Sequence, residues 1–130
     1  MDTAAWIALL NGSDALHSRA KQVMNELIQQ KVLLVTTEFV LLEVADALSI
    51  PAIRSQTVAF INGLRQLSIL EIIPVSQTLF VEGWMLYSQR SDKEWGLTDC
   101  SSFVVMTQQK ITQSFTSDRH FEQAGFVKLL

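Results

Sequence analysis

Four carboxylates occur where an alternating pattern of strands and helices would bring them together. Asp99 lies in the first turn of a predicted helix, and Asp118 follows a short predicted strand. A helix of about 12 residues advances ~18 Å, and the turn and strand after it bring the chain back towards the starting end. These two aspartates, 19 residues apart, are therefore expected at the same edge of a sheet.

Glu43 and Asp2 are the other two acids. In the predicted helix Glu38–Leu48, Glu43 falls at the edge of the apolar arc, where a carboxylate is costly unless it is paired or binds a cation. A side chain whose stem reaches water explains Glu43 equally well. Asp2 precedes a short apolar helix. Taken singly, Asp2, Asp99 and Asp118 can each be a helix-capping or loop residue.

The other reactive side chains exclude several kinds of site. The chain has two histidines, His17 and His120, and one cysteine, Cys100. It has no glycine-rich phosphate loop and no Gly-x-Ser-x-Gly motif. Zinc sites, thiol catalysis, Walker-type nucleotide binding and the serine-hydrolase elbow therefore lack their residues. Converging carboxylates would repel one another, and hard divalent cations with oxygen ligands relieve that repulsion.

Length and composition bound the class of protein. With 130 residues, 48% hydrophobic and 18% charged, the chain has the size of one domain and enough apolar residues for a core. No apolar run approaches the ~20 residues of a membrane span. A net charge of −3 and a pI near 5.3 argue against nucleic-acid binding through bulk positive charge. The single cysteine and the lack of a basic, apolar leader predict a cytoplasmic protein.

Short apolar segments alternate with longer helical ones along the chain. Helices, with their caps, are predicted over 13–30, 37–48, 53–67, 77–88 and 98–110, and again after Asp118. Strands are predicted over 32–36, 69–75, 113–116 and 126–129. Ser13, Thr37 and Thr98 are the predicted N-caps. This order favours parallel βαβ units in a three-layer α/β/α sandwich, in which ligands bind outside the carboxyl ends of the strands.

Four short motifs, in this order, resemble the PIN domain family, especially its small single-domain bacterial members, which include VapC-like toxins. The motifs are Asp2-Thr3-x-x-Trp6, Val40-Leu41-Leu42-Glu43-Val44, Leu97-Thr98-Asp99-Cys100 and Thr116-Ser117-Asp118-Arg119-His120-Phe121. The resemblance extends over essentially the whole chain. A single PIN-like domain is therefore expected over residues 1–130.

The resemblance implies a mostly parallel five-stranded sheet between helices, with a Mg²⁺- or Mn²⁺-dependent ribonuclease site at the strand carboxyl ends. By position, the catalytic and metal-binding acidic quartet of the family is matched by Asp2, Glu43, Asp99 and Asp118. Thr116 matches an accompanying hydroxyl residue, and Arg119, next to Asp118, is a candidate for substrate binding. The family has a hydrophobic strand before its first aspartate, whereas only Met1 precedes Asp2, so the first strand is expected to be truncated.

Three functional hypotheses follow. The first is a metal-dependent endoribonuclease that acts on RNA, for example tRNA or mRNA, as the toxin of a toxin–antitoxin pair. Here the resemblance implies a 5′-phosphate and a 3′-hydroxyl at the cut, a homodimer and an antitoxin partner, with no membrane involved. The second is a non-catalytic PIN-like module that binds RNA or protein, motivated by the truncated strand and the modest positive charge. The third, a phosphoacceptor domain of the response-regulator type, fits poorly because no Asp pair lies near the first strand.

Overall fold

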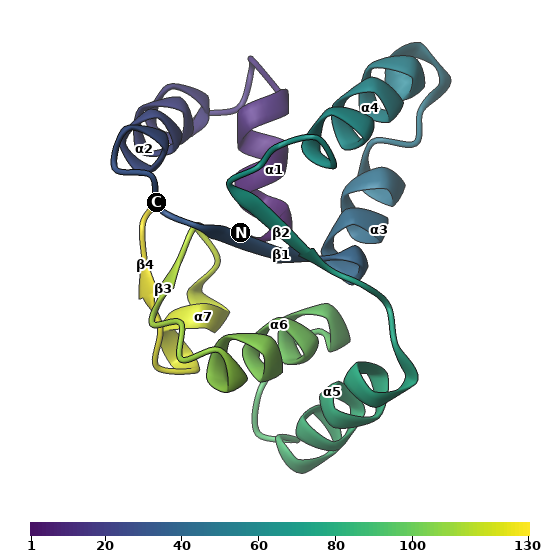
Figure 1. Ribbon diagram of the computed structural model, residues 1–130. Helices are drawn as coiled ribbons and strands as arrows, with labels where there is room; N and C mark the ends of the chain where they lie inside the picture. Colours follow the sequence, from purple (N-terminus) through teal and green to yellow (C-terminus); the bar gives the residue numbers. More distant parts are fainter.

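The computed structural model describes all 130 residues and contains seven α-helices and four short β-strands (Figure 1). In chain order these are α1 (Thr3–Leu10), α2 (His17–Gln29), β1 (Leu34–Thr37), α3 (Glu38–Ala47), α4 (Pro51–Leu64), β2 (Leu70–Ile73), α5 (Gln77–Gln89), α6 (Leu97–Gln108), β3 (Gln113–Ser114), α7 (Arg119–Gln123) and β4 (Val127–Lys128). The predicted α/β alternation is confirmed. No helix combines the length and the apolar composition that crossing a membrane requires.

The strands form two separate parallel pairs. Strand β1 pairs with β2, Leu34 lying opposite Leu70, and β3 pairs with β4, Gln113 lying opposite Val127. Helices α1, α3 and α4 lie on one side of β1 and β2, and α5 and α6 lie on the other (Figure 1). Helices therefore cover both faces, as predicted, but the expected continuous five-stranded sheet is not confirmed, because the two pairs do not join.

Met1 and Asp2 link β1 to the β3 segment through hydrogen bonds. The Met1 amino group donates to the Val35 carbonyl at 2.6 Å, and the Asp2 amide donates to the Phe115 carbonyl at 3.2 Å. The Thr36 hydroxyl donates to the Met1 carbonyl at 2.9 Å. Burial lowers the pKa of the Met1 ammonium from 8.0 to about 6, because a buried charge loses its hydration. Two residues are too few to pair along both neighbouring edges, which explains the split sheet.

Local side-chain bonds decide where the helices begin. Helix α3 starts as predicted, because the Thr37 hydroxyl accepts from the Val40 amide at 3.1 Å. The predicted cap at Ser13 is wrong. The Asn11 side-chain oxygen accepts the Ser13 amide, and the Asp14 carboxylate accepts the Leu16 amide. These bonds hold the segment in turns, so α2 begins only at His17.

The predicted cap at Thr98 is also wrong. The N-cap of helix α6 is Gly96, two residues before the predicted cap, and the helix begins at Leu97. The reason is the Asp99 carboxylate, which accepts the Gly96 amide at 2.8 Å and so closes the first turn around itself. Asp99 thereby becomes the third residue of the helix, with its side chain at the amino end of α6.

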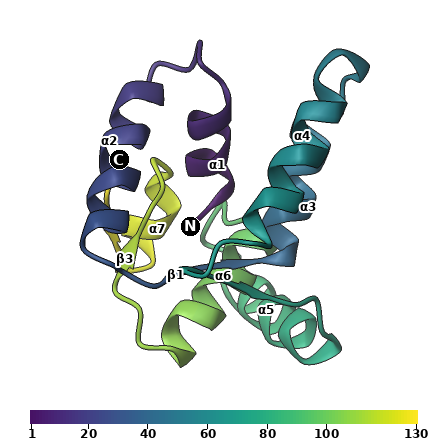
Figure 2. The same cartoon turned by 45° about the horizontal axis from the view of Figure 1, so that its top comes forward.

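Three apolar clusters hold these layers together. Helix α1 lies between α2 and the pair α3–α4 (Figure 2), so its two sides belong to different clusters. Ala5 and Ala8 pack with α2 and Phe115, whereas Trp6 packs with α3 and with Leu64 of α4. A third cluster joins α6 and α7 through Phe103 and Phe121, whose rings meet edge to face. The amino ends of α1, α6 and α7 are thus fixed by buried contacts.

Candidate metal centre

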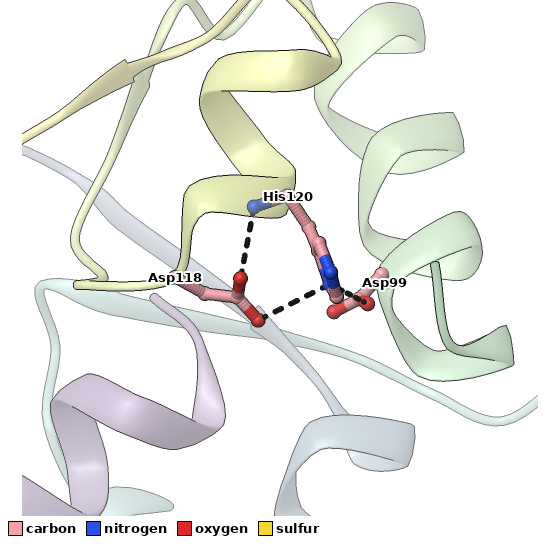
Figure 3. A group of neighbouring side chains, drawn as sticks. All are labelled: Asp99, Asp118 and His120. Atoms are coloured by element: carbon pink, nitrogen blue, oxygen red, sulfur yellow. Dashed lines mark hydrogen bonds and ion pairs between the residues drawn. The ribbon is translucent and has the colours of Figure 1, made fainter. Parts of the chain in front are cut away.

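Three side chains from α6 and from the start of α7 meet at one point (Figure 3). Asp99, Asp118 and His120 each offer a ligand atom, and these atoms all lie within 4.8 Å of one another. The His120 Nδ1 lies 3.2 Å from the Asp99 Oδ2 and 3.5 Å from the Asp118 Oδ2. All three side chains are partly buried, Asp99 most deeply, with 14% of its side chain exposed. The structure therefore brings Asp99 and Asp118 together, as their spacing predicts.

Helix amino termini hold both aspartates in place. The Asp99 Oδ2 accepts the Gly96 amide at the start of α6, and the Asp118 Oδ1 accepts the His120 amide at 2.8 Å as the N-cap of α7. These positions offer unpaired N–H groups and the positive end of the helix dipole to a carboxylate. The sequence leaves helix capping and convergence as alternative roles for Asp99 and Asp118. In the structure, both aspartates do both.

Asp2 is tied to this region through Thr116. The Thr116 hydroxyl donates to the Asp2 Oδ2 at 2.8 Å and accepts the Asp118 amide at 3.0 Å. Asp2 is 5% exposed and Thr116 is fully buried. Asp2 also caps α1, because its Oδ2 accepts the Ala4 amide at 3.4 Å. One buried hydroxyl therefore sets the position of Asp2 relative to the backbone that carries Asp118.

Glu43 approaches the same region from α3. Its carboxylate accepts a hydrogen bond from the Thr3 hydroxyl, and Thr3 directly follows Asp2. Glu43 is exposed, and neither Glu43 nor Asp2 belongs to the group of ligand atoms within 4.8 Å. Of the predicted quartet, Asp99 and Asp118 form a close pair and Asp2 is linked to the Asp118 backbone through Thr116. Glu43 is bonded to Thr3, the residue after Asp2.

Asp99 carries the electrostatic cost of this arrangement. Burial raises the pKa of its carboxyl above 3.8, and the negative charges of Asp2 and Asp118 raise it further. The Gly96 amide and His120 act in the opposite direction but do not cancel the rise. A raised pKa means that ionised Asp99 destabilises the folded state above that pKa, where the unfolded chain ionises freely.

The donor set fits a divalent cation. Carboxylate oxygens are the usual ligands of Mg²⁺ and Mn²⁺ in proteins, and Mg²⁺ is typically held by one or two carboxylates plus water and substrate phosphate. Asp99 and Asp118 would supply that pair of carboxylates. A cation between them would offset the negative charge that raises the Asp99 pKa.

Arg119 lies outside the cluster. Its guanidinium donates to the Glu94 Oε2 at 2.9 Å, and 69% of the Arg119 side chain and 81% of the Glu94 side chain are exposed. An exposed pair of this kind contributes little to stability. The predicted part of Arg119 in substrate binding stays a prediction.

Two polar residues of the site were not predicted from the sequence. Thr3 orients Glu43, and the sequence contains only one hint of this, its place beside Asp2. His120 follows Asp118 by two residues, where it could act as a base, but the resemblance implies no such role for it. In the structure its ring lies against both aspartates because α7 turns the side chain back towards α6 (Figure 3).

Comparisons with known proteins confirm the resemblance to PIN domains and VapC-like toxins. The PIN domain model matches residues 1–127. The 23S rRNA-specific endonuclease VapC20 of Mycobacterium tuberculosis, in strains CDC 1551 and H37Rv, is 27% identical over 129 residues, which is 99% of this chain and 95% of that protein. The crystal structure of M. tuberculosis VapC20, described as a sarcin-ricin loop cleaving toxin, has a TM-score of 0.83 and 28% identity and covers 97% of this chain and 94% of its own. This chain belongs to the PIN domain family.

Proposed function

We propose that this protein is a Mg²⁺- or Mn²⁺-dependent endoribonuclease that hydrolyses RNA phosphodiester bonds and serves as the toxin of a toxin–antitoxin pair. The observation that carries the proposal is the cluster of Asp99, Asp118 and His120, with Asp2 and Glu43 held beside it. The likeness to an rRNA endonuclease over nearly the full length of both chains supports the same reading.

Each acid has a part in the proposed reaction. A bound divalent ion would supply positive charge at the phosphoryl oxygens and lower the pKa of a water molecule. Asp99 and Asp118 would hold the ion, and Asp2, fixed by Thr116, would complete the ligand set. Glu43, exposed and oriented by Thr3, would direct the attacking water towards phosphorus. The leaving 3′-oxygen would then give a 3′-hydroxyl and a 5′-phosphate.

The RNA substrate is proposed from the relative, whose printed names specify 23S rRNA and the sarcin-ricin loop. The net charge of −3 does not oppose an RNA substrate, since four of the 13 acids are assigned to the proposed site and a bound cation would reduce their charge. Arg119, which follows Asp118 in the sequence and pairs with the exposed Glu94, is the cation proposed to bind a phosphate. A stem-loop RNA of the sarcin-ricin type is therefore the first substrate to try.

A homodimer in the cytoplasm, together with an antitoxin, completes the proposal. Helix α5 exposes a set of large apolar side chains, each between 45% and 53% exposed: Phe80, Val81, Trp84, Met85 and Tyr87. Exposed apolar groups of this number are unfavourable in water, and a second copy would cover them. Sedimentation of a monomer at micromolar concentration would contradict the dimer.

A non-catalytic PIN-like module that binds RNA or protein is the alternative. The split between the two strand pairs favours it, because Asp2 stands at the end of the chain rather than within a continuous sheet. This alternative predicts RNA binding without cleavage and no stabilisation by divalent cations. Membership of the PIN family removes the response-regulator hypothesis.

Asp99→Asn tests the metal centre. Without metal at pH 7, the variant should melt at a higher temperature than the wild type, because ionised Asp99 is unfavourable and Asn still accepts the Gly96 amide. With Mg²⁺ or Mn²⁺, the wild type should gain stability by mass action, and the variant should gain much less. Cleavage of the stem-loop RNA should fall at least about 100-fold.

The control is Asp46→Asn, which removes an exposed acid on the same helix as Glu43. It should leave both the metal-dependent melting shift and the cleavage rate unchanged. If the two variants behaved alike, and the wild type neither cut RNA nor gained stability from metal, the proposed function would be wrong.

Thr116→Val tests how Asp2 is held. Valine keeps the shape but leaves the Asp118 amide without a partner and the buried Asp2 Oδ2 with only the Ala4 amide, which should cost about 1–3 kcal/mol of unfolding free energy. Cleavage and metal affinity should fall about 10–100-fold, as for other groups that orient metal ligands. Thr116→Ser retains the hydroxyl and should stay near the wild type in both assays. Equal activity of the Val and Ser variants would refute this role.

A further inference from the structure

The packing of α7 holds the His120 ring against both aspartates of the metal centre. Asp118 caps this helix by accepting the His120 amide at 2.8 Å. The next residue, Phe121, is 2% exposed, and its ring meets that of Phe103 of α6 with the two centroids 4.9 Å apart. The His120 side chain is 18% exposed and points from α7 towards the start of α6 (Figure 3). The fold itself therefore places the imidazole beside the two acids.

The distances from the ring fit coordination of one ion. The His120 Nδ1 lies 3.2 Å from the Asp99 Oδ2 and 3.5 Å from the Asp118 Oδ2. Two atoms that bind one ion at right angles, each through a bond of about 2.1 Å, lie about 3 Å apart. Hydrogen bonding explains the arrangement only in part, because a single Nδ1–H can point at one of the two oxygens and not at both. The three atoms are spaced like neighbouring ligands of a cation.

The His120 Nδ1 can bind an ion while the ring stays neutral. A neutral imidazole carries its proton on one nitrogen and a lone pair on the other. In the structure, Nδ1 is the hydrogen-bonding partner of the Asp99 Oδ2. With the proton on Nε2 instead, the Nδ1 lone pair is directed at the same place, where the carboxylates of Asp99 and Asp118 already converge.

The group of close ligand atoms is not made of acids alone. His120 belongs to the group whose ligand atoms lie within 4.8 Å of one another, whereas Asp2 and Glu43 do not. The resemblance to PIN domains implies a quartet of carboxylates, and hence an ion that the protein binds through oxygen only. The structure instead brings together two oxygens and one nitrogen.

A nitrogen ligand changes which ions a site prefers. Mg²⁺ is a hard cation that takes oxygen ligands and keeps several waters. Imidazole nitrogen suits first-row transition metals better, and the affinity of a given site rises from Mn²⁺ through Fe²⁺ and Co²⁺ to Ni²⁺. A site with one nitrogen and two oxygens is therefore expected to favour these ions over Mg²⁺.

We propose that His120 is a metal ligand through its Nδ1, beside Asp99 and Asp118, and that this nitrogen makes the centre select first-row transition-metal ions over Mg²⁺. Because the ion belongs to the same centre, this inference rests on the proposed function. The cofactor is then a cation that accepts an imidazole ligand, such as Mn²⁺ or Fe²⁺. His120 binds that cation itself, rather than only orienting Asp99 through a hydrogen bond.

Pulsed electron paramagnetic resonance of the Mn²⁺-loaded protein tests the ligand directly. The spectrum should show coupling to a directly bound nitrogen, and the coupling should change when the histidines are labelled with ¹⁵N. The chain has only two histidines, so a protein without a histidine tag leaves two candidates. His120→Asn should abolish the coupling. The matched control, His17→Asn, should leave it unchanged, because the His17 Nδ1 lies 2.8 Å from the Ala8 carbonyl and outside the close group.

The selectivity is tested by dissociation constants for Mn²⁺, Co²⁺ and Mg²⁺, measured by titration calorimetry. His120→Asn keeps an amide that can hydrogen-bond to Asp99 but removes the imidazole. The variant should bind Mn²⁺ and Co²⁺ at least about tenfold more weakly than the wild type. Its affinity for Mg²⁺ should stay within about threefold, because Mg²⁺ gains little from a nitrogen ligand. A residue that only orients Asp99 would instead change the affinity for all three ions by the same factor.

Failure of this inference can be told apart from failure of the proposed function. If Mn²⁺ binds to the wild type but not to Asp99→Asn, and no nitrogen coupling appears, the metal centre stands and His120 is not a ligand. Equal weakening of all three ions by His120→Asn would lead to the same conclusion. If Asp99→Asn leaves Mn²⁺ binding unchanged, the ion lies elsewhere, and both this inference and the proposed metal centre are wrong.

Discussion

Repulsion between carboxylates is the constraint on which this site depends. Asp99 is largely buried, and it lies near enough to Asp2 and Asp118 for their charges to raise its pKa. Water cannot screen such charges inside a folded protein, so acids gathered in this way reduce the stability of the chain. A divalent cation bound between these carboxylates, as proposed, would relieve the unfavourable charge.

The fold offsets part of the cost before any ion binds. Asp2 caps α1, Asp99 closes the first turn of α6 and Asp118 caps α7, so each of the three carboxylates accepts backbone amides at the positive end of a helix. Thr116 then joins Asp2 to the Asp118 backbone through one buried hydroxyl. The same hydrogen bonds thus begin the three helices and fix the positions of the three carboxylates. Loss of a cap would misplace a proposed metal ligand as well as shorten a helix.

Interactions between residues close together in the sequence allow much of the fold and the site to be predicted. The features that the sequence does not predict depend on contacts between residues far apart in the chain. Thr37 caps α3 as expected, and the interval between Asp99 and Asp118 places both at one point. Ser13 is wrong as a cap because the Asn11 and Asp14 side chains accept the amides of Ser13 and Leu16. Thr98 is wrong because the Asp99 carboxylate accepts the Gly96 amide and the helix begins at Leu97. The bonds of Thr3 to Glu43 and of His120 to Asp99 span 40 and 21 residues, so only the packed helices reveal them. The strands are shorter than predicted because each has a partner along one edge only.

The central claim is that Asp99 and Asp118, supported by Asp2, form a divalent metal site. The most direct test is a crystal grown with Mn²⁺ and measured at an X-ray energy where manganese scatters anomalously. We expect an anomalous peak within coordination distance of the Asp99 and Asp118 carboxylates, with Asp2 oriented towards it by Thr116. A saturating concentration of Mn²⁺ that gives no peak there, or a peak bound only by other residues, would contradict it.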